Sequence, residues 1–314
     1  NIANGFATSV TQYAVLRFIA GIGLAGELGA GITLVSETLP THLRGYGTTI
    51  ISGVGVLGAV FANFISKVFD WQIAYFIGGG LGLALLVARV SVFESGIFLT
   101  TKRKDVPRGN FFQLFTKRTR FIKFMGCIFI GLPIWYAIGI LITFSPEFAK
   151  ALELTGVVGA GDAVMFSYMG LVVGDLSSGF ISQIVGSRKK IVAIYLLLTM
   201  VCVVFYLFLP IKTAGFFYIA CFTLGIAIGY WALFVTIAAE QFGTNLRSTV
   251  ATTVPNFIRG TVVPLTLAFK FLRGEMGIIH GALVIGIVTI IIAFFALNVI
   301  DETFGRDLDF EEID

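Results

Sequence analysis

The sequence is poor in the residues that build catalytic and metal-binding centres. Its 314 residues include three cysteines and two histidines, and 13% are charged, about half the share found in soluble domains. Cys127, Cys202 and Cys221 lie in apolar stretches without a CxxC pair, which favours small core residues over disulfides or metal ligands. His42 and His280 have no cysteine or acidic cluster at ligand spacing. We therefore expect no metal site and no cofactor.

Two further patterns are missing. The sequence has no GxxxxGK[ST] phosphate loop and no nucleophile–base arrangement, which argues against a nucleotide-driven pump and a membrane-embedded enzyme. Gly21-x-Gly23-x-x-Gly26 matches a dinucleotide fingerprint in spelling, but it lies inside a helical pattern, so close helix packing is the better interpretation. No cleavable signal sequence is visible and the first residue is asparagine, so we expect the N-terminus to be incomplete.

Long apolar runs dominate what is present. Hydrophobic residues make up 57% of the chain, with 32 phenylalanines, 37 glycines and a mean hydropathy of +0.93. About 20 apolar residues cross a bilayer as a helix, so we expect an all-α membrane protein with nine spans. They lie near residues 13–38, 46–66, 71–93, 123–145, 163–185, 190–209, 215–239, 249–271 and 278–300.

The distribution of positive charge predicts the orientation. Connections on one side of the spans, among them the 94–122 stretch, residues 188–190 and the C-terminal tail, contain 13 of the 22 Lys and Arg residues. Because cytoplasmic loops carry the excess of positive charge, we expect this side and the C-terminus to be cytoplasmic, in a plasma or inner membrane. The basic, Phe-rich 94–122 stretch is expected to lie on anionic headgroups, and no nucleic-acid partner is expected.

One motif recurs in the sequence. Glu37-x6-Arg44 follows the first predicted span and Glu240-x6-Arg247 the seventh, each with a Thr-Thr pair soon after. An offset of six spans is typical of two parallel six-helix halves, so nine of twelve helices are predicted here. We expect three helices of an N-terminal half in 1–99, a basic cytoplasmic linker in 100–122, a six-helix C-terminal half in 123–303 and a cytoplasmic tail in 304–314.

These motifs resemble the major facilitator superfamily over essentially the whole chain. Arg17-Phe18-x-x-Gly21-x-Gly23 resembles its Arg-x-x-x-Gly motif, and Glu37-x-x-Pro40-x-x-x-Arg44-Gly45 the cytoplasmic signature of sugar porters and metabolite:proton symporters. Gly26-Glu27 is similar to the Gly-Gly-Glu of organic-ion and metabolite symporters, and Glu302-Thr303-Phe304-Gly305 to the sugar-porter ending. The resemblance implies a transporter whose fourth to sixth helices correspond to the first three spans here.

The sequence also departs from the family. Residues 179–189 resemble the loop that gates the cytoplasmic side, but Gln183 stands where the family has aspartate. The Gln-Gln pair of sugar porters is missing from residues 123–145, and Gly58 is followed by Ala59 rather than by the proline of antiporters. The motifs therefore identify no substrate, and a drug/proton antiporter is disfavoured.

Charged residues deep in the spans are the candidate transport residues. An ionisable group at the bilayer centre is costly and faces a cavity or a partner, and Glu27, Asp175 and Arg259 lie near the middle of their spans. One hypothesis is that Asp175 or Glu27 carries a coupled proton while Arg259 binds an anionic group. The other is a fixed ion pair of Asp175 with Arg259. Arg17, nearer the outer end, is either structural or cavity-lining.

Aromatic and polar residues of the later spans extend this candidate pathway. They are Trp135, Tyr136, Tyr230, Trp231 and Asn256. Rings beside a cavity stack on substrate, whereas rings at an interface anchor to headgroups, and the depth of Tyr230 and Trp231 favours the cavity. Gly170-x-x-x-Gly174 and Gly225-x-x-x-Gly229 predict close helix contacts instead.

Charged helix ends predict a cytoplasmic gate. Glu37 with Arg44, and Glu240 with Arg247, are spaced to pair across their turns or with a neighbouring loop, as latches that break in one conformation. Plain helix capping is the alternative. The family resemblance adds three loop residues to this gate: Gln183, Gly186 and Arg188.

These features predict a secondary active transporter that works by alternating access around a midplane site. We expect a monomer that moves a small organic anion or metabolite by proton symport, with the proton as the coupling ion. A sugar porter is the alternative, and an efflux carrier a further one. A channel would need rings of like charge or carbonyl filters, and the half-repeat argues against it.

Overall fold

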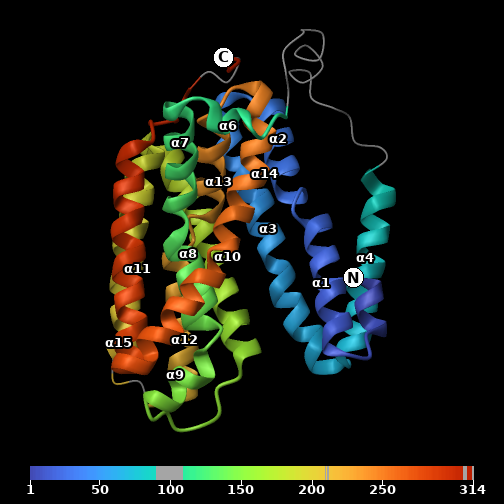
Figure 1. Ribbon diagram of the computed structural model, residues 1–314, viewed down its shortest axis with the longest axis vertical. Coiled ribbons are helices and arrows are strands. Elements are labelled where there is room, and N and C mark those ends of the chain that lie inside the picture. Colours follow the sequence, from blue (N-terminus) through green and yellow to red (C-terminus); the bar gives the residue numbers. More distant parts are fainter. Residues whose placement is uncertain (90–108, 209, 211, 307–309, 313–314) are drawn as a thin grey trace.

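The computed structural model is a helical bundle, and it describes residues 1–89, 109–208, 210, 212–306 and 310–312. Side chains are described for these residues except 28, 36, 37, 41, 42, 44, 45 and 89. Most helices run along one long axis, with the C-terminus at one end (Figure 1). We call that end of the bundle the Arg188 end and the opposite end the Gly277 end.

The first 89 residues form a short 3₁₀ helix and four α-helices. These are η1 (Ile2–Phe6), α1 (Val10–Leu24), α2 (Glu27–Thr38), α3 (Thr41–Val68) and α4 (Trp71–Arg89). The Ser9 side chain accepts a hydrogen bond from the Gln12 N–H at 3.2 Å, so α1 begins at a capping residue. Leu39 is extended because it precedes Pro40, and this conformation ends α2.

The remaining described residues form the larger part of the bundle. Its elements are α6 (Gln113–Thr116), α7 (Arg118–Ile130), α8 (Leu132–Tyr136), the π-helix η2 (Ala137–Ile142), α9 (Ser145–Ala151), α10 (Ala160–Val185), α11 (Arg188–Phe208), α12 (Ala214–Ala227), α13 (Trp231–Glu240), α14 (Thr244–Gly260) and α15 (Val262–Val299). The first five residues of helix α7, 118–122, belong to the predicted linker, and residues 100–108 of that linker lie outside the described residues.

Eight stretches of the described residues are long and apolar enough to cross a membrane, and the last, Thr244–Val299, has 56 residues. A straight helix of 56 residues would measure about 84 Å, nearly three bilayer cores. The backbone instead reverses at Gly277, whose φ of 82° is not helical, and Gly281 packs against the backbone of Leu272 and Arg273. The eight stretches therefore give nine passes, and the predicted all-α membrane bundle is confirmed.

Burial differs strongly between the two parts of the bundle. Among the 18 most apolar consecutive residues of each span, 78% are buried in Arg118–Ile142 and in Ala214–Glu240, whereas 12% are buried in Val10–Val35 and 6% in Trp71–Ala88. The core therefore lies around α7, α8, α12 and α13. Large apolar side chains of α1 and α4 face outward, among them Phe18, Leu81 and Val87. Such surfaces require apolar surroundings of the kind that a bilayer provides.

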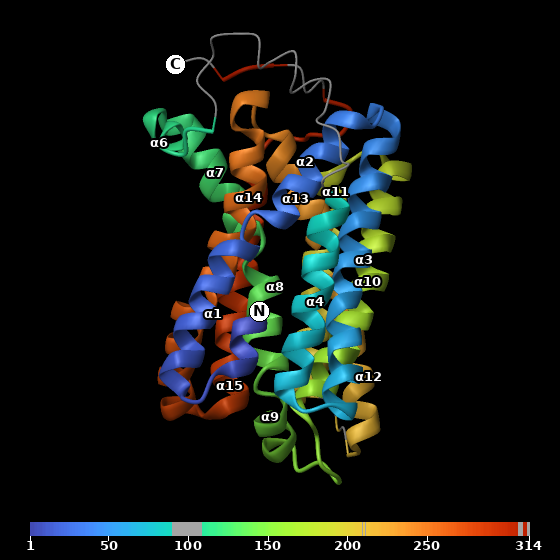
Figure 2. The same ribbon diagram turned by 90° about the vertical axis from the view of Figure 1, so that its right-hand side faces the viewer.

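The two parts meet along two helix pairs. Helix α3 packs along α10, and α2 crosses α14 near the Arg188 end (Figures 1 and 2). A Cβ added at Gly29 of α2 would lie 2.6 Å from the Thr252 Cα of α14, so only glycine allows this approach. Among the described residues, nothing lies within 4 Å of a Cβ added at Gly21, Gly23 or Gly26. The described residues thus provide no close helix contact at these three glycines.

Helices α10 and α12 make the closest contact of the kind predicted from glycine spacing. A Cβ added at Gly170 would lie 2.0 Å from the Phe222 carbonyl oxygen, and one added at Gly225 would lie 2.0 Å from that of Ser167. One turn further on, a Cβ at Gly174 would lie 2.7 Å from the Gly229 Cα. The prediction of close contacts at both GxxxG pairs is confirmed.

Candidate functional site

A cavity of about 460 Å³ lies between the first three long helices and the larger part of the bundle. Its lining residues are Leu24, Glu27, Gly31, Ile51, Ser52, Gly55, Val56, Ala59, Tyr168, Trp231 and Arg259. They come from α1, α2 and α3 on one side and from α10, α13 and α14 on the other. The volume suits a small molecule, and an apolar lining with a few polar groups is typical of small-molecule sites.

Four spans are interrupted next to residues that line this cavity, or next to Trp135, whose ring packs against that of Trp231. The interruptions are Ala25-Gly26 between α1 and α2, Gly131 between α7 and α8, residues 228–230 between α12 and α13, and Thr261 between α14 and α15. Each contains a glycine or directly follows one. Broken helices expose backbone polar groups and helix ends inside the protein, and membrane transporters build substrate and ion sites from such ends.

Arg259 is the cation of the cavity, and two indole rings lie beside it. Its Cζ lies 5.4 Å from the ring centroid of Trp231 and 5.7 Å from that of Trp135, within the range of cation–π attraction. The two indoles meet edge to face, with centroids 5.9 Å apart. Within the described part of the chain no carboxylate forms an ion pair with Arg259. The rings hold the guanidinium without cancelling its charge.

Asn256 connects Arg259 to the interruption between α1 and α2. Its Nδ2 donates to the Ala25 carbonyl oxygen at 2.7 Å and to that of Thr252 at 2.7 Å. Its Oδ1 accepts a longer hydrogen bond from Arg259 Nη1 at 3.4 Å. Residues three apart share a helix face, so one face of α14 carries both the cation and the group that binds α1. Asn256 supports the cavity and does not line it.

Glu27 lies in the same cavity as Arg259, at the start of α2. The sequence predicted a mid-helix position for it, but the interruption at Ala25-Gly26 makes it the first residue of a new helix. A carboxylate is favourable there because the N-terminal end of a helix carries partial positive charge. The cavity therefore presents a carboxyl group and a cation from opposite parts of the bundle.

Asp175 is fully buried and lies beside the cavity lining. One carboxylate oxygen accepts the Ala232 N–H at 3.0 Å, and the other accepts the Ser52 hydroxyl at 3.0 Å. Among the described residues no ion pair joins Asp175 to Arg259, so the structure does not contain the fixed ion pair considered from the sequence.

Three other predicted pathway residues lie away from the cavity. The Tyr136 hydroxyl donates to the Ala282 carbonyl oxygen at 2.7 Å, and the Tyr230 hydroxyl donates to that of Ile130 at 3.0 Å. Both rings are fully buried, so they hold helices together, and the depth of Tyr230 did not indicate a cavity position. Arg17 lies over the Tyr75 ring, with its Cζ 6.0 Å from the centroid.

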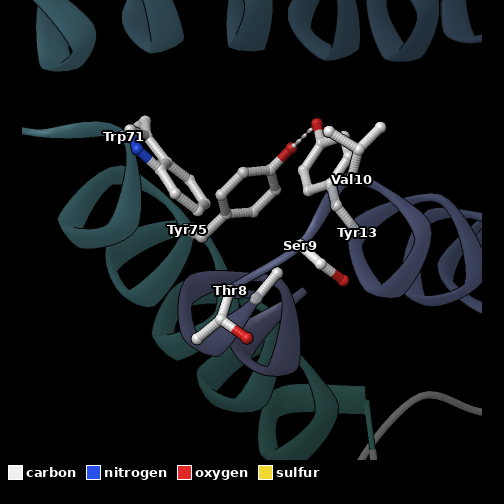
Figure 3. Close-up of a pocket in the computed structure, with 7 residues that line it drawn as sticks. Thr8, Ser9, Val10, Tyr13, Trp71 and Tyr75 are labelled. Atoms are coloured by element: carbon white, nitrogen blue, oxygen red, sulfur yellow. Dashed lines mark hydrogen bonds between the residues drawn. The ribbon is translucent and has the colours of Figure 1, made fainter.

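A second pocket, of about 540 Å³, lies near Arg17 and belongs to the N-terminal helices alone. Figure 3 shows Tyr13 and Tyr75 joined through their hydroxyls, with Trp71 beside Tyr75. The two hydroxyl oxygens are 2.7 Å apart, and the three rings meet edge to face. None of its lining residues is charged. The cavity around Arg259 is the better candidate because it joins the two parts of the bundle and carries charge.

Two of the predicted gate residues form an ion pair at the Arg188 end, and it is the second of the two predicted kinds, with a neighbouring loop. Arg188 Nε and Nη2 donate to the two carboxylate oxygens of Glu240 at 2.7 and 2.8 Å, so Glu240 pairs with a neighbouring loop. Arg247 is fully buried, and its Nη2 donates to the Thr244 hydroxyl at 3.4 Å. The side chains of Glu37 and Arg44 lie outside the described residues.

The loop that follows α10 receives the C-terminal tail. Gly186 ends α10 with a φ of 68°, a left-handed conformation that favours glycine. Glu302 then accepts hydrogen bonds from the Ser187 hydroxyl at 2.5 Å and from the Arg188 N–H at 3.0 Å. Gln183 lies in the last turn of α10, and its Nε2 has no hydrogen-bond partner among the described residues. The tail therefore caps the N-terminus of α11.

Sequence reasoning missed Ser52 and Tyr168, which both line the cavity. Ser52 continues a buried polar row on α3 that begins at Thr48 and Thr49, each 2% exposed or less. Small polar residues four apart in an apolar helix are the signal that was available. Tyr168 had no such signal, because a tyrosine in a span is equally typical of a core or an interface.

Comparison with known proteins agrees with this geometry. The family model described as Major Facilitator Superfamily matches residues 2–259. The chain is 26% identical to a sialic acid transporter of Escherichia coli over an alignment of 253 positions, which covers 78% of this chain and 60% of that protein. It is 24% identical to a probable 4-methylmuconolactone transporter of Cupriavidus pinatubonensis, with coverages of 96% and 72%.

A gentisate transporter of Corynebacterium glutamicum is 27% identical over an alignment of 316 positions, which covers 94% of this chain and 68% of that protein. All three relatives are named as transporters and none as an enzyme. The chain thus spans 60% of the length of the sialic acid transporter and about 70% of the other two.

Proposed function

Because the chain belongs to the major facilitator superfamily, we propose that it acts in secondary active transport and moves a small organic carboxylate together with a proton by alternating access. The observation that carries the proposal is Arg259, a cation that packs against two indole rings in a cavity shared by both parts of the bundle. Its charge is left for a ligand.

The chemistry of the cavity favours a carboxylate. A guanidinium presents a planar fork of donors that matches a carboxylate in a bidentate geometry. Trp231 and Tyr168 add flat apolar surface beside it, on which a ring or another planar group packs well. Sialic acid, 4-methylmuconolactone and gentisate, for which the relatives are named, all carry a carboxylate.

Glu27 is the proposed proton carrier. It faces the same cavity as Arg259 but comes from the other part of the bundle. A proton on Glu27 and an anion at Arg259 enter together as a neutral pair, so the cavity does not bear an uncompensated charge during the change of access. A carboxylate and its proton thereby move in one cycle.

The direction of access follows from the contacts around the cavity. On its Arg188 side, the Thr236 hydroxyl donates to that of Thr48 at 3.0 Å, and Gly29 lies against Thr252. These contacts close the cavity toward the Arg188 end. With that end and the C-terminus in the cytoplasm, as the positive charges predict, the structure is closed to the cytoplasm. Opening then separates α2 from α14.

Uptake by proteoliposomes tests the proposal. The full-length protein is reconstituted, and internal pH is recorded after addition of gentisate or of a pool of neutral sugars. We expect acidification with gentisate, its loss in Arg259→Gln, and its retention in Lys270→Gln, a matched control whose exposed cation lies in the same span outside the cavity. Acidification with the sugars alone, or with neither addition, overturns the proposal.

A further inference from the structure

The start of helix α13 lacks a cap of its own. Phe234 N–H makes the first hydrogen bond of the helix, to the Tyr230 carbonyl oxygen at 2.8 Å, so the preceding N–H groups have no partner within α13. Tyr230 stands at the capping position, and its side chain makes no capping bond. Bulk solvent does not reach these donors, because Ala232 and Leu233 are buried. An acceptor must therefore come from elsewhere in the protein.

Asp175 of α10 is that acceptor. Its carboxylate lies 3.0 Å from the Ala232 nitrogen and is completely buried. The approach is possible because the two backbones touch directly before it: a Cβ added at Gly229 would lie 2.3 Å from the Gly174 Cα. A carboxylate at a helix N-terminus also meets the positive end of the helix dipole. Asp175 thus caps α13 from a neighbouring helix.

The residue that this cap fixes is Trp231, the first residue of α13. Trp231 lines the cavity and lies 5.4 Å from the Arg259 guanidinium. The second carboxylate oxygen of Asp175 accepts the Ser52 hydroxyl from α3, and Ser52 lines the cavity as well. One buried carboxylate therefore holds two residues of the cavity lining, one from each part of the bundle. It binds Ser52 directly and fixes Trp231 through the next residue, Ala232.

We propose that Asp175 is a positioning residue, which caps α13 so that Trp231 holds Arg259 in its binding orientation, and that Asp175 does not carry the coupled proton. The inference rests on the proposed anion site at Arg259. It predicts that the hydrogen bonds of Asp175 matter and that its charge does not. An asparagine keeps the acceptor for Ala232 and offers an amide to Ser52, whereas an alanine keeps neither.

The test uses the full-length protein with Asp175→Asn, Asp175→Ala and, as a matched control, Asp162→Asn, which changes another carboxylate of α10 that contacts Lys67 and Asn63. Three quantities are measured: the gentisate Kd in detergent, the tryptophan emission spectrum without ligand, and the number of protons taken up per gentisate. Trp231→Phe assigns the part of the spectrum that Trp231 contributes.

For Asp175→Asn we expect an unchanged proton number and a Kd within about twofold of the parent. For Asp175→Ala we expect a Kd about tenfold weaker, the effect of losing a buried hydrogen bond to a charged group, together with a shifted Trp231 emission. Asp162→Asn leaves the gentisate Kd, the Trp231 emission and the proton number unchanged.

Two results overturn the inference. The first is loss of proton uptake in Asp175→Asn with gentisate binding intact, which makes Asp175 the proton carrier. The second is an Asp175→Ala variant with the parent's Kd and emission. If Asp175→Ala does not fold, the proton number of Asp175→Asn still decides. If Arg259→Gln binds gentisate as tightly as the parent, the anion site has failed, and the Trp231 emission of Asp175→Ala still tests the cap.

Discussion

Arg188 and Glu240 form a buried bidentate ion pair, with donor–acceptor distances of 2.7 and 2.8 Å and side chains 3% and 2% exposed. The guanidinium comes from the first residue of α11 and the carboxylate from the last residue of α13. Two parallel hydrogen bonds between a planar fork and a carboxylate are the strongest form of this contact. The pair therefore fixes the loop after α10 against α13.

Breaking this pair should destabilise the protein strongly. Glu240→Gln leaves the Arg188 charge buried without a countercharge, at a cost of about 3–5 kcal/mol. Thermal unfolding in detergent measures the loss. The matched control is Glu147→Gln, which breaks the ion pair of Glu147 with Arg273, where both side chains are more than 40% exposed, and should cost at most about 1 kcal/mol. Equal effects of the two variants would contradict the argument.

The Glu240 pair also shows where sequence reasoning stops. The spacing Glu240-x6-Arg247 left two alternatives open, a pair within its own turn or one with a neighbouring loop. Glu240 pairs with Arg188 beside the loop after α10, which is the second alternative, but the spacing did not identify this partner 52 positions away. Local spacing limits which groups can meet within one turn, whereas the packing of α11 against α13 decides which charges meet across the bundle. The nine passes and the GxxxG contacts were predictable because length and residue size are local properties.

The interruptions of the spans were not predictable in the same way. Apolar residues continue on both sides of residues 228–230, so hydropathy shows one span where the structure has two helices. Tyr230 and Trp231 are neighbours in sequence and equally deep, yet only Trp231 lines the cavity. The interruption turns the two side chains in different directions, and depth alone cannot show this.

Glu302 gives a pH-dependent contact at the Arg188 end. Burial raises the pKa of Glu302, but hydrogen bonds from the Ser187 hydroxyl and the backbone N–H groups of Phe304, Arg188 and Lys189 outweigh it, and the pKa lies below its ordinary value of 4.5. The contact therefore contributes its full stability above about pH 4.5 and loses it as the pH falls through the lower pKa of the folded state.

Hydrogen exchange of the amides of residues 187–190, corrected for the intrinsic effect of pH, measures this contact. We expect protection to fall below pH 4.5 in the parent and to be reduced already at pH 7 in Glu302→Gln. Asp301→Asn is the control, because the Asp301 carboxylate pairs with Lys123. Unchanged protection in Glu302→Gln at pH 7 would show that the tail does not cap α11.

Gly225 should not tolerate a methyl group. A Cβ there would lie 2.0 Å from the Ser167 carbonyl oxygen and 3.0 Å from the Leu171 nitrogen, both backbone atoms of α10. Because a backbone cannot rotate away as a side chain does, Gly225→Ala should cost about 1–3 kcal/mol through separation of α10 from α12.

The matched control lies on the same helix. Nothing in the described residues lies within 4 Å of a Cβ added at Gly215, so Gly215→Ala should stabilise α12 by about 0.5–1 kcal/mol. Thermal unfolding of the two variants should therefore move in opposite directions from the parent. A gain of stability in both would mean that helix propensity and not the contact with α10 decides the effect.

Glu27→Gln tests the proton site without removing the anion site. The amide keeps the shape of the side chain but takes up no proton, so gentisate should still bind at Arg259 and exchange across the membrane, whereas accumulation driven by a pH gradient should fail. Exchange of labelled gentisate and pH-driven accumulation in the same proteoliposomes separate the two steps. Glu275→Gln, an exposed carboxylate on α15 outside the cavity, should leave both intact.

The outcome is informative because Glu27 and Asp175 were equal candidates from the sequence, and the structure puts them in different surroundings. Glu27 lines the cavity, where a proton and a substrate can reach it, whereas Asp175 is sealed behind Ser52 and the start of α13. A proton carrier has to be reached from each side of the membrane in turn. Accumulation that survives in Glu27→Gln would contradict the assignment. If accumulation were at the same time lost in Asp175→Asn, Asp175 would be the proton site.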